Sequence, residues 1–272
     1  MPFVEVPDSP HAPGIHPVRI HYRDVGSGSP LVFLHGGWGY ESYPIRHQIE
    51  AFADRVRFVI PSRSGHGLSQ RISGPMPSDF HQRAAEETLL VLNALSIERA
   101  IFWGHSDGAV IAARIGLTAP DRCVRLVLEA IHLQRSKPNS RDFFQKFAQH
   151  PGEVKESMQK LLAADHGENH WKNVVQRNCR AWLQLAADSA RAGDDLVGDD
   201  LYDGRLSQLK VPVTLIHGRL DPRTEPGELE QARKILPHAD IHFIEPGRHS
   251  PHSESKSWPQ CNKILHGLLP QK

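Results

Sequence analysis

The sequence predicts an α/β fold in which a mostly parallel central sheet is covered by helices on both faces. Short apolar runs alternate with amphipathic, helix-length stretches over residues 30–130, and the alternation resumes after residue 209. The apolar runs, such as those at 56–60 and 100–104, lack alternating polar residues, which is typical of strands buried on both faces. The length of 272 residues suits one large domain or a core domain with an insertion.

The first half of the chain supplies most of these elements. Residues 18–25 and 30–35 have strand character and are joined by a glycine–serine turn at 26–29, so we expect them to pair. The helix expected at 79–95 has charges on one side and leucines on the other. The remaining predicted elements are an amphipathic stretch at 43–53, strands at 56–60, 100–104 and 125–130, and a helix at 107–118.

The pattern changes after residue 130. Residues 131–208 are polar and helical in character, without strand-like runs. We therefore expect an α/β core formed by residues 1–130 and 209–272, interrupted by a helical cap at 131–208. The last predicted elements are strands at 211–218 and 241–245 and helices at 226–236 and 257–268.

Composition excludes several classes of protein. The 32 Lys and Arg residues nearly balance the 31 Asp and Glu residues, and no basic stripe favours a nucleic-acid partner. No apolar run has the length of a membrane span, and residues 1–14 lack the pattern of a signal peptide. Cys123, Cys179 and Cys261 are far apart and in no CxxC motif, which favours a reducing compartment. We therefore expect a cytoplasmic protein.

The 18 histidines raise the question of a metal site. His166 and His170 have the i, i+4 spacing with which two ligands can share a helix face. No third ligand is evident and HExxH is absent, so we favour a solvated helix face. We expect neither a metal nor another cofactor.

The sharpest motif is Gly104-His105-Ser106-Asp107-Gly108, which matches G-x-S-x-G. It stands directly after an apolar strand and before a helix, the context in which a nucleophilic serine is exposed on a tight turn. A serine that only caps the helix is the alternative. The strand, the helix and the partner residues described below favour Ser106 as a nucleophile.

The glycine-rich loop His35-Gly36-Gly37-Trp38-Gly39 follows the strand at 30–35. Such a loop lets a backbone N–H group approach a carbonyl oxygen and stabilise an oxyanion. We expect the N–H groups of Gly37 and Asp107 to be the two donors. The Trp38 ring is expected to form a wall of the substrate pocket.

An acid and a base follow the last two predicted strands. Asp221 lies in HGRLD after the strand at 211–218, and His249 lies in GRHSPH after the strand at 241–245. Both loops should reach the sheet edge that carries Ser106, in the chain order Ser, Asp, His. His252 is a rival base and Glu129, at the end of the strand 125–130, is a rival acid.

Together these motifs resemble the α/β-hydrolase superfamily over nearly the whole chain. The matching segments are HGGWG, RSGHGLS at 63–69, GHSDG, HGRLD and GRHSPH, although Ser62 stands where an acidic residue is usual. The resemblance implies the α/β-hydrolase fold, in which the sheet carries a catalytic triad. Here that triad would be Ser106, Asp221 and His249.

GHSDG and the helix before it look like the valacyclovir hydrolase-like (biphenyl hydrolase-like) branch. That resemblance implies hydrolysis of small or amino-acid esters, with Asp107 recognising a substrate amine. A carboxylate in the first turn of a helix is also stabilised by the helix dipole, whatever the substrate.

The sequence therefore predicts a serine hydrolase that cleaves small carboxylic esters through an acyl-enzyme intermediate, without nucleic-acid or membrane partners. Three alternatives remain open: a meta-cleavage carbon–carbon bond hydrolase, a proline iminopeptidase-like aminopeptidase, and a ligand-sensing homologue with little turnover. The second is included because HGGWG resembles the HGGPG motif of proline iminopeptidases. The oligomeric state and the physiological substrate do not follow from the sequence.

Overall fold

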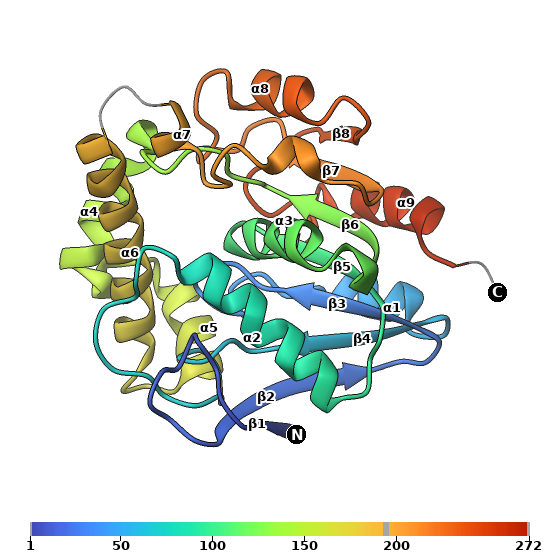
Figure 1. The fold of residues 1–272 in the computed structure, drawn as a ribbon, viewed down its shortest axis with the longest axis horizontal. Helices are drawn as coiled ribbons and strands as arrows, with labels where there is room; N and C mark the ends of the chain where they lie inside the picture. The colour runs from blue at the N-terminus through green and yellow to red at the C-terminus, as the bar shows by residue number, and fades with distance from the viewer. Residues whose placement is uncertain (1, 193–195, 271–272) are drawn as a thin grey trace.

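The computed structural model describes residues 2–192 and 196–270. In these ranges eight strands form one sheet with the order β1-β2-β4-β3-β5-β6-β7-β8 (Figure 1). Strand β2 is antiparallel to its neighbours β1 and β4, and the pairs from β4 to β8 are parallel. The strands are β1 (Phe3–Val6), β2 (Val18–Val25), β3 (Ser29–Leu34), β4 (Val56–Pro61), β5 (Ala100–His105), β6 (Cys123–Glu129), β7 (Val213–Gly218) and β8 (Asp240–Ile244). The predicted fold class is confirmed.

Helices connect most of the parallel strands. In the described ranges they are α1 (Arg46–Phe52), α2 (Phe80–Ala94), α3 (Asp107–Thr118), α4 (Arg141–Gln149), α5 (Glu156–His166), α6 (Trp171–Ala192), α7 (Leu196–Asp199), α8 (Glu228–Ile235) and α9 (Trp258–Leu268). Short 3-10 turns lie at Pro120–Arg122, Pro138–Ser140, Pro151–Glu153 and Leu206–Gln208. None of the described helices combines the length and apolar character needed to cross a membrane.

Two apolar layers enclose the sheet. In β5, Ala100 and Phe102 belong to the cluster formed with α2 and α3, whereas Ile101 and Trp103 belong to the cluster formed with α1 and α9. Successive side chains of a strand point to opposite faces, so a strand covered on both sides must be apolar throughout. This explains why the central strands have continuous apolar sequences, and Figure 1 shows helices on both sides of the sheet.

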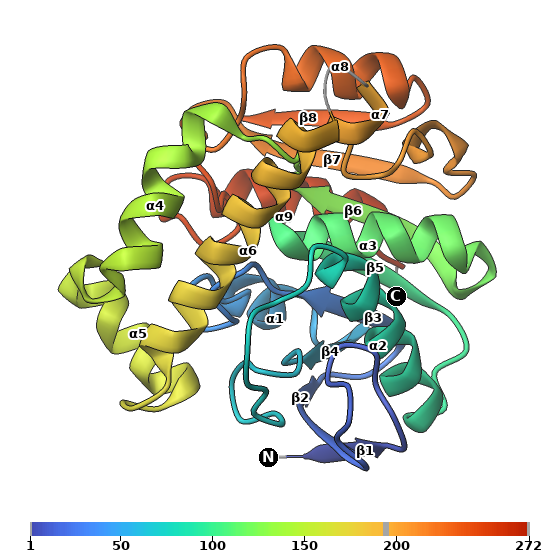
Figure 2. The ribbon, with the colours of Figure 1, turned by 60° about the vertical axis from the view of Figure 1, so that its left-hand side comes forward.

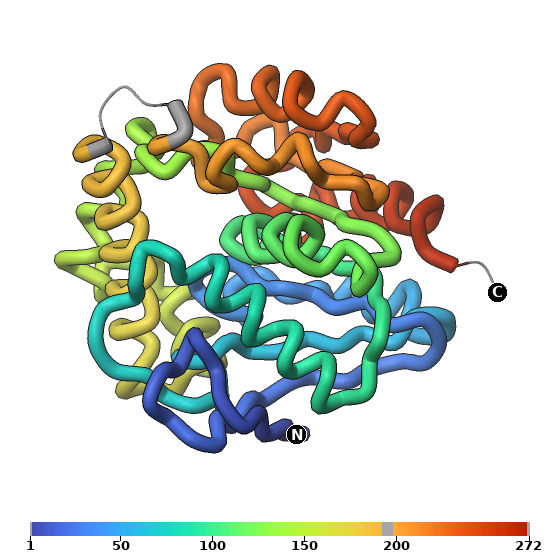
Figure 3. The backbone as a smooth tube through the Cα atoms, viewed as in Figure 1, coloured from blue at the N-terminus to red at the C-terminus, as the bar shows by residue number. Residues whose placement is uncertain are grey.

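Helices α4 to α7, which we call the cap helices, lie between β6 and β7 in the chain. Figure 2 shows α6 crossing the carboxyl ends of the parallel strands, with α4 beside it. The tube in Figure 3 follows the chain from β6 out to these helices and back to β7. The described residues of this segment form helices joined by turns and loops, and the one β contact among them is an isolated bridge between Gln134 and Asp200. The cap helices therefore cover the sheet edge at which the predicted site residues lie.

The expected pairing of residues 18–25 with 30–35 is wrong. Strand β4 lies between β2 and β3, antiparallel to the first and parallel to the second. The turn that suggested a hairpin instead contacts the backbone leading into β4. A Cβ atom on Gly26 would lie 2.4 Å from the carbonyl oxygen of Val56, and one on Gly28 would lie 2.4 Å from that of Arg55. The glycines thus permit a close backbone approach, which sequence patterns do not distinguish from a hairpin turn.

The solvated helix face expected for His166 and His170 is also wrong. Helix α5 ends at His166, so His170 belongs to the following turn. His166 is fully buried, accepts the Gly67 N–H group at 2.8 Å through Nδ1 and donates to the Trp38 carbonyl at 3.0 Å through Nε2. It is therefore a neutral structural histidine that joins a cap helix to two loops of the core.

Neutral histidines are common in the interior. Burial away from water lowers the pKa of ten histidines in the described ranges. They are His11, His21, His35, His66, His81, His105, His132, His166, His170 and His217. The fold therefore encloses many imidazoles that protonate readily only when the chain unfolds.

Candidate active site

Ser106 stands on a tight turn between β5 and α3. Its backbone has φ 56° and ψ −120°, an unfavourable conformation for a residue with a side chain. The flanking glycines allow the turn to close. A Cβ atom on Gly104 would lie 2.0 Å from the Gly108 carbonyl oxygen, and one on Gly108 would lie 1.9 Å from that of Leu34. The spacing of the motif is thus a steric requirement, and the turn presents the serine hydroxyl at the sheet edge.

The loops after β7 and β8 bring the predicted acid and base to this serine. The Nε2 atom of His249 lies 3.1 Å from Ser106 Oγ. Its Nδ1 atom lies 3.0 and 2.9 Å from the two carboxylate oxygens of Asp221. A proton on Nδ1 would be donated to Asp221, which leaves Nε2 free to accept the serine proton. The three side chains therefore form one hydrogen-bonded row.

The environment keeps Asp221 ionised. Burial opposes ionisation, but the charge and hydrogen bond of His249 outweigh it and hold the pKa of Asp221 well below its usual range. The Arg223 backbone N–H group also donates to Asp221 Oδ1 at 2.8 Å. An ionised carboxylate in this position can orient the imidazole and stabilise its protonated form.

Glu129 and His252, the alternative acid and the alternative base, form a hydrogen bond with each other. His252 Nδ1 lies 2.8 Å from Glu129 Oε1, both side chains are fully buried, and His252 Nε2 donates to the Tyr43 carbonyl at 2.9 Å. Burial lowers the pKa of His252, but the charge and hydrogen bond of Glu129 outweigh it, so the pKa is raised. Glu129 also accepts the Trp103 indole N–H group at 3.0 Å. This buried pair stabilises the interior of the protein next to the triad.

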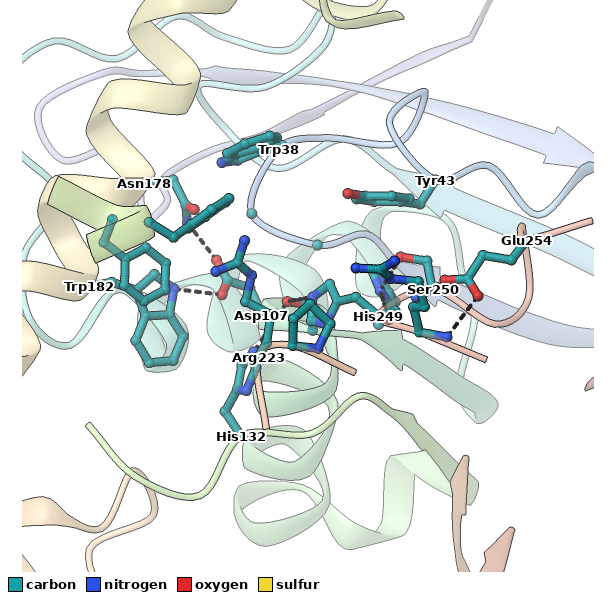
Figure 4. A pocket seen from close by; sticks show the side chains of 18 residues that line it. Trp38, Tyr43, Asp107, His132, Asn178, Trp182, Arg223, His249, Ser250 and Glu254 are labelled. Atoms are coloured by element: carbon teal, nitrogen blue, oxygen red, sulfur yellow. Dashed lines mark hydrogen bonds between the residues drawn. The ribbon is translucent and has the colours of Figure 1, made fainter. Parts of the chain in front are cut away.

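A cavity of about 300 Å³ opens at the serine (Figure 4). Aromatic rings form much of its apolar surface, and polar side chains, among them Ser106 and His249, line the rest. The Trp38 ring stacks on Phe143, with 5.3 Å between ring centroids and an interplanar angle of 16°. The aromatic residues that line the cavity are Trp38, Tyr43, Phe143, Phe144 and Trp182. Trp38 thus lies in the wall, at the position expected from the sequence.

The two expected oxyanion donors belong to residues that border the cavity beside Ser106. Asp107 is the first residue of α3, so its N–H group has no acceptor within the helix. Gly37 lies against the cap helices, because a Cβ atom there would come within 2.4 Å of the Asn178 side chain. Both residues therefore border the cavity, and their role as oxyanion donors stays a prediction.

Arg63 orients the loop that contains Gly37. Its buried guanidinium donates to the carbonyl oxygens of His35 at 2.5 Å and Gly36 at 2.8 Å. Two carbonyl groups of the loop are thereby directed toward Arg63. The sequence placed Arg63 in a loop resembling that of the family but gave it no function, because the partner carbonyls are distant in the chain.

His132 is a second histidine at the nucleophile that sequence reasoning missed. Its Nε2 atom lies 3.4 Å from Ser106 Oγ, and its ring is stacked with that of His249 at 5.9 Å between centroids. Burial, reinforced by the charge of Lys137, lowers the pKa of His132 well below its usual value. A positional signal was available, since His132 follows β6 at the sheet edge where functional side chains gather.

The Asp107 carboxylate is bound by the cap helices. Asn178 Nδ2 donates to one oxygen at 2.7 Å and Trp182 Nε1 donates to the other at 3.0 Å (Figure 4). His81 Nε2 lies 3.6 Å away, and burial lowers its pKa, so it is a neutral neighbour. These contacts favour a structural role for Asp107, while amine recognition by this residue stays a prediction.

Comparison with known proteins finds a family model and several hydrolases to which this chain is similar. The model of the Alpha/beta hydrolase family matches residues 31–256. Human serine hydrolase BPHL is 21% identical, over 94% of this chain and 84% of its own length. A pimeloyl-[acyl-carrier protein] methyl ester esterase of Aliivibrio salmonicida is 25% identical, over 85% of this chain and 89% of its own length.

Among solved structures, a thermophilic esterase from Thermogutta terrifontis superimposes with a TM-score of 0.72. It is 16% identical, and the match covers 98% of both chains, so this similarity supports the fold alone. The family model matches most of the chain, so it shows membership of the family as well as the fold. The chain belongs to the alpha/beta hydrolase family.

Proposed function

We propose that the protein is a serine hydrolase that cleaves small carboxylic esters through an acyl-enzyme intermediate. The observation that carries the proposal is the hydrogen-bonded row of Ser106, His249 and Asp221 at the mouth of an aromatic cavity. The relative named as a methyl ester esterase supports the reaction class. The cavity volume of about 300 Å³ favours a small substrate.

The mechanism follows from the order of the groups. Ser106 Oγ attacks the ester carbonyl while His249 Nε2 accepts its proton, and Asp221 stabilises the resulting imidazolium. The N–H groups of Gly37 and Asp107 would stabilise the oxyanion. His249 then protonates the departing alcohol and activates a water molecule, which releases the acid and restores the serine.

The test uses Ser106→Ala. Fluorophosphonate labelling should disappear and ester turnover should fall by about 10³-fold or more, because the attacking oxygen is lost. The thermal melt should change little, since Ser106 Oγ is removed without leaving an apolar cavity. A variant that still reacts with the probe would show that another residue is the nucleophile.

A second experiment compares the turnover of aryl esters with that of a meta-cleavage dienoate and an aminoacyl arylamide. These compounds represent the carbon–carbon hydrolase and aminopeptidase alternatives, which can use the same three side chains. Faster turnover of either compound than of the esters would replace the proposed reaction class while keeping the triad. Labelling without turnover of any compound would favour a ligand-sensing protein.

A further inference from the structure

Arg223 lies in the cavity wall, two residues after Asp221 (Figure 4). Its guanidinium carbon is 3.1 Å from the centroid of the Phe143 ring, so the charged group rests on an aromatic face inside the site. Within residues 2–192 and 196–270, no carboxylate lies within 4 Å of its nitrogen atoms. A partly buried charge normally has a partner of opposite sign. The partner of Arg223 is therefore expected from outside the chain.

The carboxylates around the cavity are already engaged. Asp221 accepts hydrogen bonds from His249, and Asp107 accepts them from Asn178 and Trp182. Glu254 accepts the backbone N–H groups of residues 248 and 250 at 2.8 and 3.0 Å. These carboxylates are held by other donors, which leaves the guanidinium of Arg223 available to a ligand.

Tyr43 supplies a neutral donor to the same cavity. Burial raises the pKa of Tyr43, although the charge of Arg223 opposes that rise, so the phenol keeps its proton near neutral pH. In the described part of the chain its hydroxyl has no hydrogen-bond partner. Figure 4 shows the Tyr43 ring on one side of the cavity, with Arg223 toward its centre. The guanidinium of Arg223 and the phenol of Tyr43 therefore both belong to residues that line this cavity.

We propose that Arg223 and Tyr43 form a subsite for a carboxylate group, so that the preferred ester carries a free carboxylate at one end. This inference rests on the proposed ester hydrolysis. The planar guanidinium can bind a carboxylate through two hydrogen bonds. The aromatic walls contact the short apolar chain between the carboxylate and the ester. Arg248, which is exposed and also borders the cavity, adds positive charge at the rim.

The experiment compares two substrates that differ at one end, which is a free carboxylate in the first and a neutral methyl ester in the second. The p-nitrophenyl monoester of glutaric acid carries the carboxylate, and its methyl-capped diester does not. In the wild type we expect kcat/KM for the acid to exceed that for the methyl-capped compound by about tenfold or more, since hydrogen bonds to charged groups are the stronger ones. Arg223→Gln should reduce this ratio at least tenfold. Arg223→Lys should retain part of it, and Tyr43→Phe should reduce it less than Arg223→Gln does.

Arg219 provides the matched control. It lies four residues earlier on the same loop, is exposed and pairs with Glu245 outside the cavity lining. Arg219→Gln removes the same charge from the surface, so it should keep the wild-type ratio. Thermal melts of all variants establish that they fold.

Different results would overturn the carboxylate subsite and the proposed ester hydrolysis. Turnover of both glutarate compounds at similar kcat/KM, with no response to Arg223→Gln, would overturn the carboxylate subsite and keep the proposed function. A preference for an aminoacyl ester over the glutarate monoester would also overturn the subsite. Absence of Ser106 labelling together with absence of turnover would overturn the proposed function itself.

Discussion

Asp107 stands next to the nucleophile, where its backbone and side chain face different parts of the protein. The N–H group lies in the first turn of α3, where it has no acceptor within the helix, while the carboxylate accepts hydrogen bonds from Asn178 and Trp182 on α6. Burial opposes ionisation of Asp107, but His81, Trp182 and the charge of Arg63 outweigh it and lower its pKa. The residue is thus an ionised link between the nucleophile turn and the cap helices.

Asp107→Asn tests this interpretation. The new amide would place an NH₂ group against one of the two donors, so the variant should lose about 1–3 kcal/mol of stability. We expect kcat/KM to fall by a similar factor for an aminoacyl ester and for a simple acyl ester of the same alcohol. Thermal melts and paired kinetics provide the measurement. A loss confined to the aminoacyl ester would instead assign amine recognition to Asp107.

At the scale of single elements, a buried ion pair holds the chain in place just before the cap helices begin. Lys137, in the turn before α4, places Nζ 2.9 Å from Glu228 of α8 and 4.0 Å from Glu225. All three side chains are about 1% exposed. Glu228 also accepts the Leu133 backbone N–H group at 2.7 Å. These contacts hold the chain that leaves β6 against the helix that follows β7.

Lys137→Met should destabilise the protein by about 3–5 kcal/mol, because two carboxylates would remain buried without their cation. The control is Lys146→Met. Lys146 forms a 3.3 Å pair with Glu153, and both side chains are more than half exposed, so its loss should cost at most about 1 kcal/mol. Urea unfolding followed by circular dichroism measures both values. Equal, small changes in the two variants would show that the buried pair contributes little.

Some elements follow from local sequence and others do not. Helix α3 has the predicted bounds 107–118, because the nucleophile motif fixes its start and an apolar pattern marks its length. Strand β1 was missed, because its four residues are stabilised by pairing with β2 rather than by a pattern of their own. The position of β4 between β2 and β3 depends on packing between distant segments. Periodicity describes each strand separately and does not determine which strand is its neighbour.

The same limit applies to buried polar groups. Glu87 was expected on the charged side of its helix, yet it is 2% exposed. It accepts the Ser64 N–H group at 2.9 Å and the Ser9 hydroxyl at 2.7 Å. It thereby stabilises the loop in which Ser62 replaces the usual acidic residue. Sequence alone does not reveal such pairs, because the partners lie 23 and 78 positions away from Glu87.

For the whole molecule, the ten neutral histidines determine how stability depends on pH. Their pKa values in the folded state lie below that of an exposed histidine, as for His11 at about 4. The unfolded chain therefore binds more protons below about pH 6.5, and stability is lost as the pH falls from there. His252 acts in the opposite sense, because its raised pKa adds stability that is lost as the pH increases.

Each buried neutral histidine contributes a slope of up to about 1.4 kcal/mol per pH unit. Since ten lowered pKa values oppose one raised value, the melting temperature should fall steeply between about pH 6.5 and pH 5. Thermal melts across pH 5 to 8 measure this dependence. A melting temperature that stays constant between pH 7.5 and pH 5 would contradict it. Measurements of activity in this range should therefore be accompanied by a folding assay.

The hydrogen bonds from α6 to Asp107 have a consequence for engineering. A lid that touched only the substrate could be exchanged between related enzymes to transfer specificity. Here Asn178 and Trp182 bind the residue that follows the nucleophile. A chimera that received a foreign segment without these two donors would lose turnover even for substrates that fit. Transplanting specificity into this scaffold therefore requires keeping both donors, or redesigning residue 107 together with the new segment.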